Sequence, residues 1–278
     1  MTVLSFSLVT GLGSVAAGLL GALTGLGGGI IVIPMLTLLF GVDMRYAAGA
    51  ALISVIATSS GAASAYVREG YSNLRVGMFL EIATTMGAVL GATLAGHVAT
   101  SALAVTFGVV LLASAGLSLR KHADAASDDR PDPLATRLRL DGSYPTPAGP
   151  RAYHVHGVPA ACTLMLVAGG LSGLLGIGSG AVKVLALDWA MRLPFKVSTT
   201  TSNFMIGVTA AASAGVYLSR GYIDPGLAMP VMLGVLVGSL AGARLLPRLQ
   251  SRVLRLLFTM VIALLGVEMI RNGLQGHV

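Results

Sequence analysis

A cluster of glycines interrupts a long apolar stretch near the N-terminus, and a second cluster repeats it. The first runs from Gly25 to Gly29 and is followed by Pro34, and the second runs from Gly176 to Gly180, 151 residues further on. Within a bilayer, non-helical backbone is tolerated only where it is buried in protein or lines a wet cavity. Interruptions at matching places in two halves point to a binding site. We therefore predict two broken helices around a wet, positively biased site. The alternative is that the glycines only allow helices to pack closely.

Nucleotide and enzyme motifs are absent from the sequence. No Gly-Lys-Ser/Thr follows either glycine cluster, and Ile30 and Ala181 stand where a dinucleotide fingerprint has its third glycine. There is no HExxH, no Gly-x-Ser-x-Gly and no Cys/His cluster. We predict that the protein is not an enzyme and has no cofactor and no metal.

The composition is that of an all-α polytopic membrane protein. Of 278 residues 55% are hydrophobic and only 10% are charged, where a soluble domain has about 25% charged residues. The net charge of +7 is spread over loops, so we interpret it first as an orientation signal. The sequence has no basic-aromatic patch of the kind that binds nucleic acid, so we do not expect a nucleic-acid partner. The first basic residue is Arg45, so we expect the first apolar segment to be retained rather than cleaved as a signal peptide.

Ten apolar segments are visible. They cover residues 5–24, 28–41, 47–67, 76–97 and 102–119, and then 157–175, 179–192, 197–218, 227–246 and 253–271. Most reach the ~20 residues that a membrane-spanning helix needs, but the two that follow the glycine clusters are shorter. We predict a first membrane repeat over 1–120, a partly disordered cytoplasmic linker over 121–156 and a second membrane repeat over 157–278.

The two halves align without gaps at the 151-residue displacement. Arg45 then meets Lys196, Thr58 meets Thr209, and the glycines of Gly87-x-x-x-Gly91 meet those of Gly238-x-x-x-Gly242. That glycine spacing is typical of helix packing in membranes. An odd number of segments in each half would insert the second half upside down, as in many transporters.

Loop charges test this topology. With ten crossings one side holds most basic residues: Arg68, Arg75, Arg120, Lys121, Arg130, Arg137, Arg139, Arg151, Arg192, Lys196, Arg248 and Arg252. The other side holds Arg45, Arg220 and Arg271. This asymmetry places the linker in the cytoplasm and both termini outside. If each short segment joins its predecessor as one span, there are eight crossings and parallel halves, with a weaker charge bias.

Ionisable residues inside a bilayer are functional candidates by default. Lys183 follows the second glycine cluster by one turn, where its charge would favour an anion; the alternative is an ion pair with Asp188. Asp188 and Arg192 have i,i+4 spacing, which indicates a structural pair. Glu81 lies near the start of its segment, so we expect it to be solvated, with a proton relay as the alternative.

Hydroxyl and amide groups form a second candidate set. Segment 197–218 opens with Ser-Thr-Thr-Thr-Ser-Asn over 198–203, and such groups can replace the water shell of an oxyanion. The predicted substrate-binding residues are Gly27, Gly28, Gly29, Arg45, Gly178, Ser179, Gly180, Lys183, Lys196, Thr201, Ser202 and Asn203.

The order of these features resembles the TauE/SafE family of sulfite and organosulfonate exporters. The resemblance rests on Gly25 to Pro34, Arg45, and Tyr66 to Tyr71 ahead of the Gly87 motif, with the same order in the second half. It covers nearly the whole chain except 120–156. One departure is Gly-Ala-Ala-Leu at 49–52, where the family's Gly-Thr-Ser-Leu pattern has two hydroxyls. Any site should therefore be asymmetric and weighted toward the second half.

The resemblance implies a secondary transporter that exports sulfite or a short organosulfonate across the cytoplasmic membrane by alternating access. Uniport would be assisted by the inside-negative potential. The partners would be a small anion and membrane lipid, and a homo-oligomer is left open. The alternatives are an anion channel of the same architecture and an accessory subunit without transport of its own.

Overall fold

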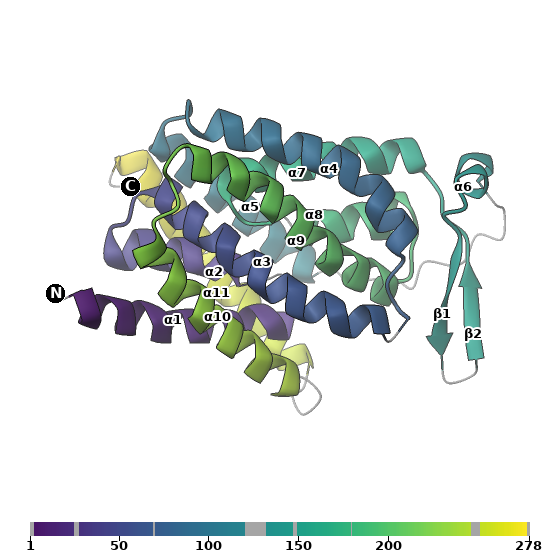
Figure 1. The fold of residues 1–278 in the computed structure, drawn as a ribbon, viewed down its shortest axis with the longest axis horizontal. Coiled ribbons are helices and arrows are strands. Elements are labelled where there is room, and N and C mark those ends of the chain that lie inside the picture. The colour runs from purple at the N-terminus through teal and green to yellow at the C-terminus, as the bar shows by residue number, and fades with distance from the viewer. Residues whose placement is uncertain are drawn as a thin grey trace.

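The computed structural model describes residues 3–24, 28–68, 70–119, 132–146, 149–178, 180–245 and 251–276. Nearly all of this part of the chain is helical (Figure 1). Before the linker lie α1 (Val3–Thr24), α2 (Gly29–Pro34), the π-helix η1 (Met35–Leu39), α3 (Met44–Arg68), α4 (Leu74–Ala95) and α5 (Thr100–Leu119). After it lie α7 (Val158–Leu175), α8 (Gly180–Leu185), the π-helix η2 (Ala186–Ala190), α9 (Phe195–Ser219), α10 (Pro225–Leu245) and α11 (Ser251–Gln275). Each expected apolar segment corresponds to a helix, or to a short helix continued by a π-helix, with ends shifted by a few residues.

The outer surface of the bundle is apolar. On α4, five large side chains four residues apart form an exposed stripe: Met78, Ile82, Met86, Leu90 and Leu94. Water would disfavour such a continuous apolar face, whereas lipid covers it without cost. Among the described residues, three helices are long and apolar enough to cross a membrane, namely Leu74–Ala95, Val158–Leu175 and Pro225–Gly242. These features indicate an all-α membrane protein.

Helices from before and after the linker pack against each other. α1 lies along α10, α4 along α7, α5 along α11 and α3 along α9, and α4 also contacts α9. Both ends of the chain lie at one end of the bundle, and α6 and the β-hairpin project from the other (Figure 1). Each of these pairs joins helices far apart in sequence, so neither part of the chain builds its core alone.

Glycines allow these helices to touch through their backbones. A Cβ added at Gly87 would collide with the carbonyl oxygen of Leu166 on α7, and one at Gly91 with that of Gly170. On the other side of the bundle, a Cβ at Gly238 of α10 would collide with the carbonyl oxygen of Val15 on α1. The predicted helix-packing role of Gly87, Gly91 and Gly238 is confirmed.

Part of the linker is folded onto the end of the bundle. It contains α6 (Pro133–Arg137) and the antiparallel pair β1 (Gly142–Thr146) and β2 (Gly149–Tyr153). Leu140, Tyr153 and Val155 are buried in one cluster with Val76 and Leu80 of α4. The Asn73 amide nitrogen donates to the Leu140 carbonyl (2.9 Å) and to the Tyr153 hydroxyl (2.8 Å). The predicted linker, 121–156, also includes 121–131 and 147–148, which lie outside the described residues, so its partial disorder stays a prediction.

The glycine contacts predict that an added methyl group lowers stability only where the glycine touches another helix. Gly87→Ala and Gly238→Ala should each destabilise the protein by about 1–3 kcal/mol, because the added Cβ must push two helix backbones apart. Thermal unfolding of the detergent-purified protein measures this. The matched control is Gly116→Ala on α5, where a Cβ meets no atom within 4 Å. Equal melting temperatures for all three variants would contradict the packing role.

Tyr153 predicts how the docked hairpin responds to alkali. Burial raises the pKa of Tyr153 from 10.0 to about 12; the hydrogen bond from Asn73 lowers it, and the nearby Asp141 charge raises it. The folded pKa lies above the unfolded value, so the stabilisation is present below about pH 10 and is lost as pH rises toward about 12. A phenolate absorbance titration of the wild type should show one late-titrating tyrosine that Tyr153→Phe lacks. An unchanged titration in the variant would count against the docking described here.

Candidate functional site

The second glycine cluster separates α7 from α8. Helix α7 ends at Leu175, and Gly176 and Gly178 then adopt φ of +74° and +69°. Residues other than glycine rarely adopt this left-handed backbone conformation. The space is also limited, since a Cβ at Gly178 would press on Ile206 of α9 and Val55 of α3. This stretch of backbone is therefore non-helical and enclosed by two other helices.

The described end of the first cluster, Gly28 and Gly29, leads into α2 with right-handed backbone at Gly28. Gly28 and Gly29 are buried, and a Cβ at either would crowd Val235 of α10 or Val55. Gly25, Gly27 and Ser179 lie outside the described residues, so the binding role expected of Gly27 and Ser179 stays a prediction. α2 and α8 are each six residues long and each continues into a five-residue π-helix.

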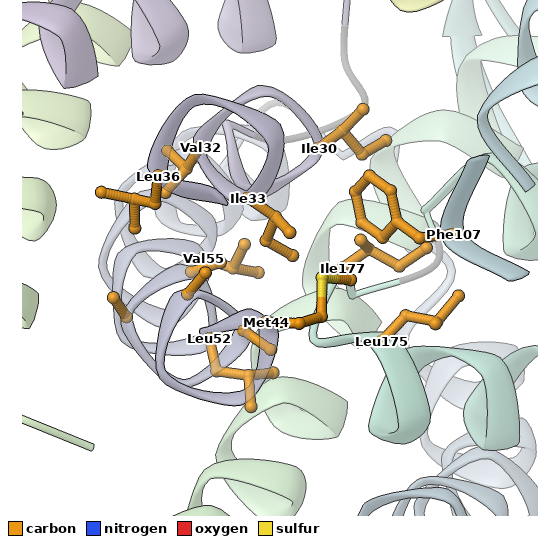
Figure 2. Packing of buried hydrophobic residues seen from close by; sticks show 14 of the residues in the cluster. Ile30, Val32, Ile33, Leu36, Met44, Leu52, Val55, Phe107, Leu175 and Ile177 are labelled. Carbon is orange, nitrogen blue, oxygen red and sulfur yellow. The ribbon is translucent and has the colours of Figure 1, made fainter. Parts of the chain in front are cut away.

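The described glycines of both clusters are closed to solvent in this structure. Gly28, Gly29, Gly178 and Gly180 are all buried. Apolar side chains gather around them, and Ile30 and Ile33 of α2 belong to one cluster with Phe107 and Ile177 (Figure 2). The predicted site is thus covered rather than open, because side chains of α3, α9 and α10 lie against the glycines.

Lys183 is fully buried on α8, with 0% of its surface exposed. Its ammonium donates a hydrogen bond to the Thr209 hydroxyl of α9. Its electrostatic partner is Glu81 of α4 rather than Asp188. A charge in such surroundings is costly unless it is paired, so three helices must meet here for Lys183 to be accommodated.

Glu81 completes this group. Its Oε1 accepts from the Thr209 hydroxyl at 2.5 Å and from Thr85 at 3.4 Å. Its Oε2 is buried and has no hydrogen-bond partner among the described residues. Only 7% of Glu81 is exposed, so the expectation that it would be solvated is wrong. The reason is tertiary: α7 and α9 pack on α4 and cover this turn.

The hydroxyl-rich start of α9 has two roles. Ser202 donates to the Gly180 carbonyl at 3.3 Å and so joins α9 to the first turn of α8. Thr201 instead accepts from the backbone N–H of Asn73 at 3.0 Å, which ties α9 to the loop before α4. Asn203 is half-buried. The structure therefore brings Gly180, Lys183 and Ser202 together, while Thr201 belongs to the hairpin end.

Arg45 and Lys196 lie at opposite ends of the bundle. The Arg45 guanidinium donates to the carbonyl of Ala95, the last residue of α4, and to that of Val98, and it lies 5.7 Å from the Tyr222 ring centroid. The Lys196 ammonium lies 5.2 Å from the ring centroid of Tyr71, just before α4. The length of α4, roughly 30 Å, separates them, so they do not share a site.

The combination of Lys183, Thr209 and Glu81 has no counterpart at the 151-residue displacement. At the 151-residue displacement Val32 stands for Lys183, Met232 for Glu81 and Thr58 for Thr209. The Thr58 hydroxyl donates only to carbonyls of its own helix, those of Ser54 and Val55. Sequence reasoning identified Lys183 but not Thr209. The available signal was helical spacing, since Ser202, Thr209 and Ser213 lie on one face of α9.

The fold and the buried polar group define an all-α membrane protein with an internal charged site, a class that includes transporters. The profile of the family described as "Sulfite exporter TauE/SafE" matches residues 10–269. The chain belongs to this family. It is 25% identical over 98% of its length to a probable membrane transporter protein, YunE, of Bacillus subtilis, covering 99% of that protein. It is 24% identical over 91% of its length to the probable membrane transporter protein MJ0441 of Methanocaldococcus jannaschii, covering 91% of that protein.

No solved structure matches the chain. The family and the names of its relatives indicate a membrane transporter rather than an enzyme.

The hydrogen-bonded network of Lys183, Thr209 and Glu81 predicts that the three residues contribute jointly to the stability of the protein. Lys183→Met should destabilise the protein by about 3–5 kcal/mol, because it leaves the Glu81 charge buried and unpaired. Adding Glu81→Gln should restore part of that loss. Thr209→Val should cost about 1–3 kcal/mol, whereas the matched control Thr58→Val should stay within about 0.5 kcal/mol. Thermal unfolding in detergent measures all of these, and strictly additive single and double variants would refute the network.

Proposed function

We propose that this transporter is a secondary carrier that exports a small sulfur-containing oxyanion, sulfite or a short organosulfonate, across the cytoplasmic membrane by alternating access. One observation carries the proposal: a fully buried lysine, Lys183, lies beside non-helical backbone inside an apolar bundle. The family's description as a sulfite exporter supports the choice of substrate.

The groups near Lys183 suit a compact oxyanion. An ammonium has three donors, of which Thr209 uses one. Ser202 and the half-buried Asn203 lie about two turns before Thr209 on α9. The Asn203 amide would supply further donors, and Ser202 would turn the hydrogen that it now gives to the Gly180 carbonyl. Gly178 and Gly180 would offer backbone N–H groups without side chains in the way. Several oxygens on one small anion can accept from all of these groups together.

Alternating access would follow from two inverted repeats. α3 and α9 are each 25 residues long and begin 151 residues apart, at Met44 and Phe195. The contact of α4 with α7 has its counterpart in that of α10 with α1. The contact of the Arg45 guanidinium with the Tyr222 ring corresponds in the same way to that of the Lys196 ammonium with the Tyr71 ring. Five segments per repeat would place the repeats in opposite orientations, with Arg45 and Lys196 at the two entrances and the linker in the cytoplasm.

The closed glycine breaks fit an occluded state in this cycle. Lys183 would then reach either side only when one repeat rocks against the other. Outward movement of an anion would be favoured by the inside-negative potential, by about 2.3 kcal/mol per charge per 100 mV.

A thermal-shift screen tests the proposal. Sulfite or a short sulfonate should raise the melting temperature of the detergent-purified protein, because a ligand that binds only the folded state stabilises it. Taurine, which also carries a positive charge, should have a smaller effect. The double variant Lys183→Met/Glu81→Gln, which keeps the site neutral, should fold and lose the shift.

Transport itself is measured in proteoliposomes. Saturable uptake that is accelerated by unlabelled anion on the opposite side would support a carrier. Rapid, non-saturating conductance would indicate a channel. A purified protein that moves none of the anions would leave the accessory-subunit interpretation.

A further inference from the structure

The Thr209 hydroxyl stands between a buried acid and a buried base and has only one hydrogen to give. Its oxygen is near three groups: the Lys183 ammonium, Glu81 Oε1 at 2.5 Å, and the Met205 carbonyl of its own helix at 2.9 Å. The ammonium can only donate, and the carbonyl can only accept. Thr209 can therefore donate either to Glu81 or to Met205, but not to both.

These two choices correspond to two protonation states of Glu81. When Thr209 donates to Glu81, the carboxyl group is an ionised acceptor and balances the Lys183 charge. When Thr209 donates to Met205, the short contact with Glu81 requires that Glu81 carry a proton and donate it to Thr209. Both states satisfy the hydroxyl with the same positions of the heavy atoms. One proton thus separates a neutral group from a group with one net positive charge.

An uncompensated positive charge is costly inside an apolar bundle. Lys183 is 0% exposed and Glu81 is 7% exposed, so water cannot offset the charge. A bound anion can. Proton uptake by Glu81 and anion binding at Lys183 are therefore each unfavourable alone and favourable together, and such linkage is reciprocal.

The other titratable groups near Glu81 do not substitute for it. Helix α7 brings Cys162, and α9 brings Lys196 and Tyr217, but none of these is among the partners that the structure gives to Glu81, which are Lys183, Thr209 and Thr85. Lys196 is exposed over Tyr71, and Tyr217 donates to the Leu174 carbonyl. Lys183 of α8 is the charged group that faces Glu81.

We propose that the protein binds its anion together with one proton, which is taken up by Glu81. The proposal rests on the anion site at Lys183 put forward above and adds a coupling ion to it. The proton moves from solvent to a Glu81 carboxylate oxygen, Thr209 turns its hydrogen to Met205, and Lys183 directs its free N–H groups to the anion. A dianion would then cross with one net negative charge, and a monoanion with none.

Calorimetric titration of the detergent-purified protein with sulfate and with methanesulfonate tests this, since both probes keep their charge over about pH 6 to 9. Titrations in two buffers of different ionisation enthalpy count the protons. The wild type should take up about one proton per anion at neutral pH and above, and the anion Kd should then rise about tenfold per pH unit.

Glu81→Gln should bind the anion with no proton uptake and with an affinity independent of pH when it is compared at about pH 6 to 7, where Lys183 keeps its charge. The matched control is Glu268→Gln on α11, whose carboxylate pairs with Arg271 at 2.6 Å and lies outside the site. This control should keep the wild-type proton count.

The outcomes separate the two proposals. Anion binding by the wild type without proton uptake or pH dependence would overturn the coupling and leave the anion site intact. A Glu81→Gln variant that still takes up a proton would assign the proton to another group and would also overturn it. No binding of sulfate, methanesulfonate or the screened anions at any pH would remove the anion site and the coupling with it. The wild-type proton count decides the matter even if the variant fails to fold.

Discussion

Backbone contact between helices from the two parts of the chain is the constraint on which the structure depends. In lipid there is little hydrophobic gain from joining two apolar helices, so close packing must hold them together. Gly87 and Gly91 place α4 directly against α7, and Gly238 places α10 against α1. These contacts bring α4, which carries Glu81, beside α9, which carries Thr209.

The buried polar group follows from that arrangement. Lys183, Thr209 and Glu81 come from three helices, and no two of them are neighbours in sequence. A lysine at this depth is tolerated because a hydroxyl and a carboxylate are held within reach. The positions 151 residues earlier or later hold Val32, Thr58 and Met232, so the two charges have no counterpart there.

The proton proposal changes the energetics of export. A carrier that moves a bare anion is driven by the full membrane potential, whereas an anion that leaves with one proton carries one negative charge fewer. For a dianion such as sulfite the potential still favours exit. For a monoanion the potential has no effect, and the concentration and pH gradients decide the direction. The charge of the substrate would thus decide whether the membrane potential contributes to export.

Much of the helical framework could be predicted from the sequence because membrane helices are read from apolar length and glycine spacing. The approximate helix bounds follow from the length of each apolar segment, and the packing role of Gly87, Gly91 and Gly238 follows from their spacing. The family follows from the order of short motifs along the chain. Lys183 could also be singled out, since a charge in an apolar segment is conspicuous by itself.

The partners of Lys183 and the accessibility of the site were decided by tertiary structure alone. Sequence spacing suggested Asp188 for Lys183, but the packing of α4 on α9 supplies Glu81 instead. The same packing buries Glu81, which its position near a helix start had suggested was solvated. Arg45 and Lys196 match in sequence yet lie at opposite ends of α4. Residue order records which segments are apolar, whereas burial and charge pairing depend on which distant helices meet.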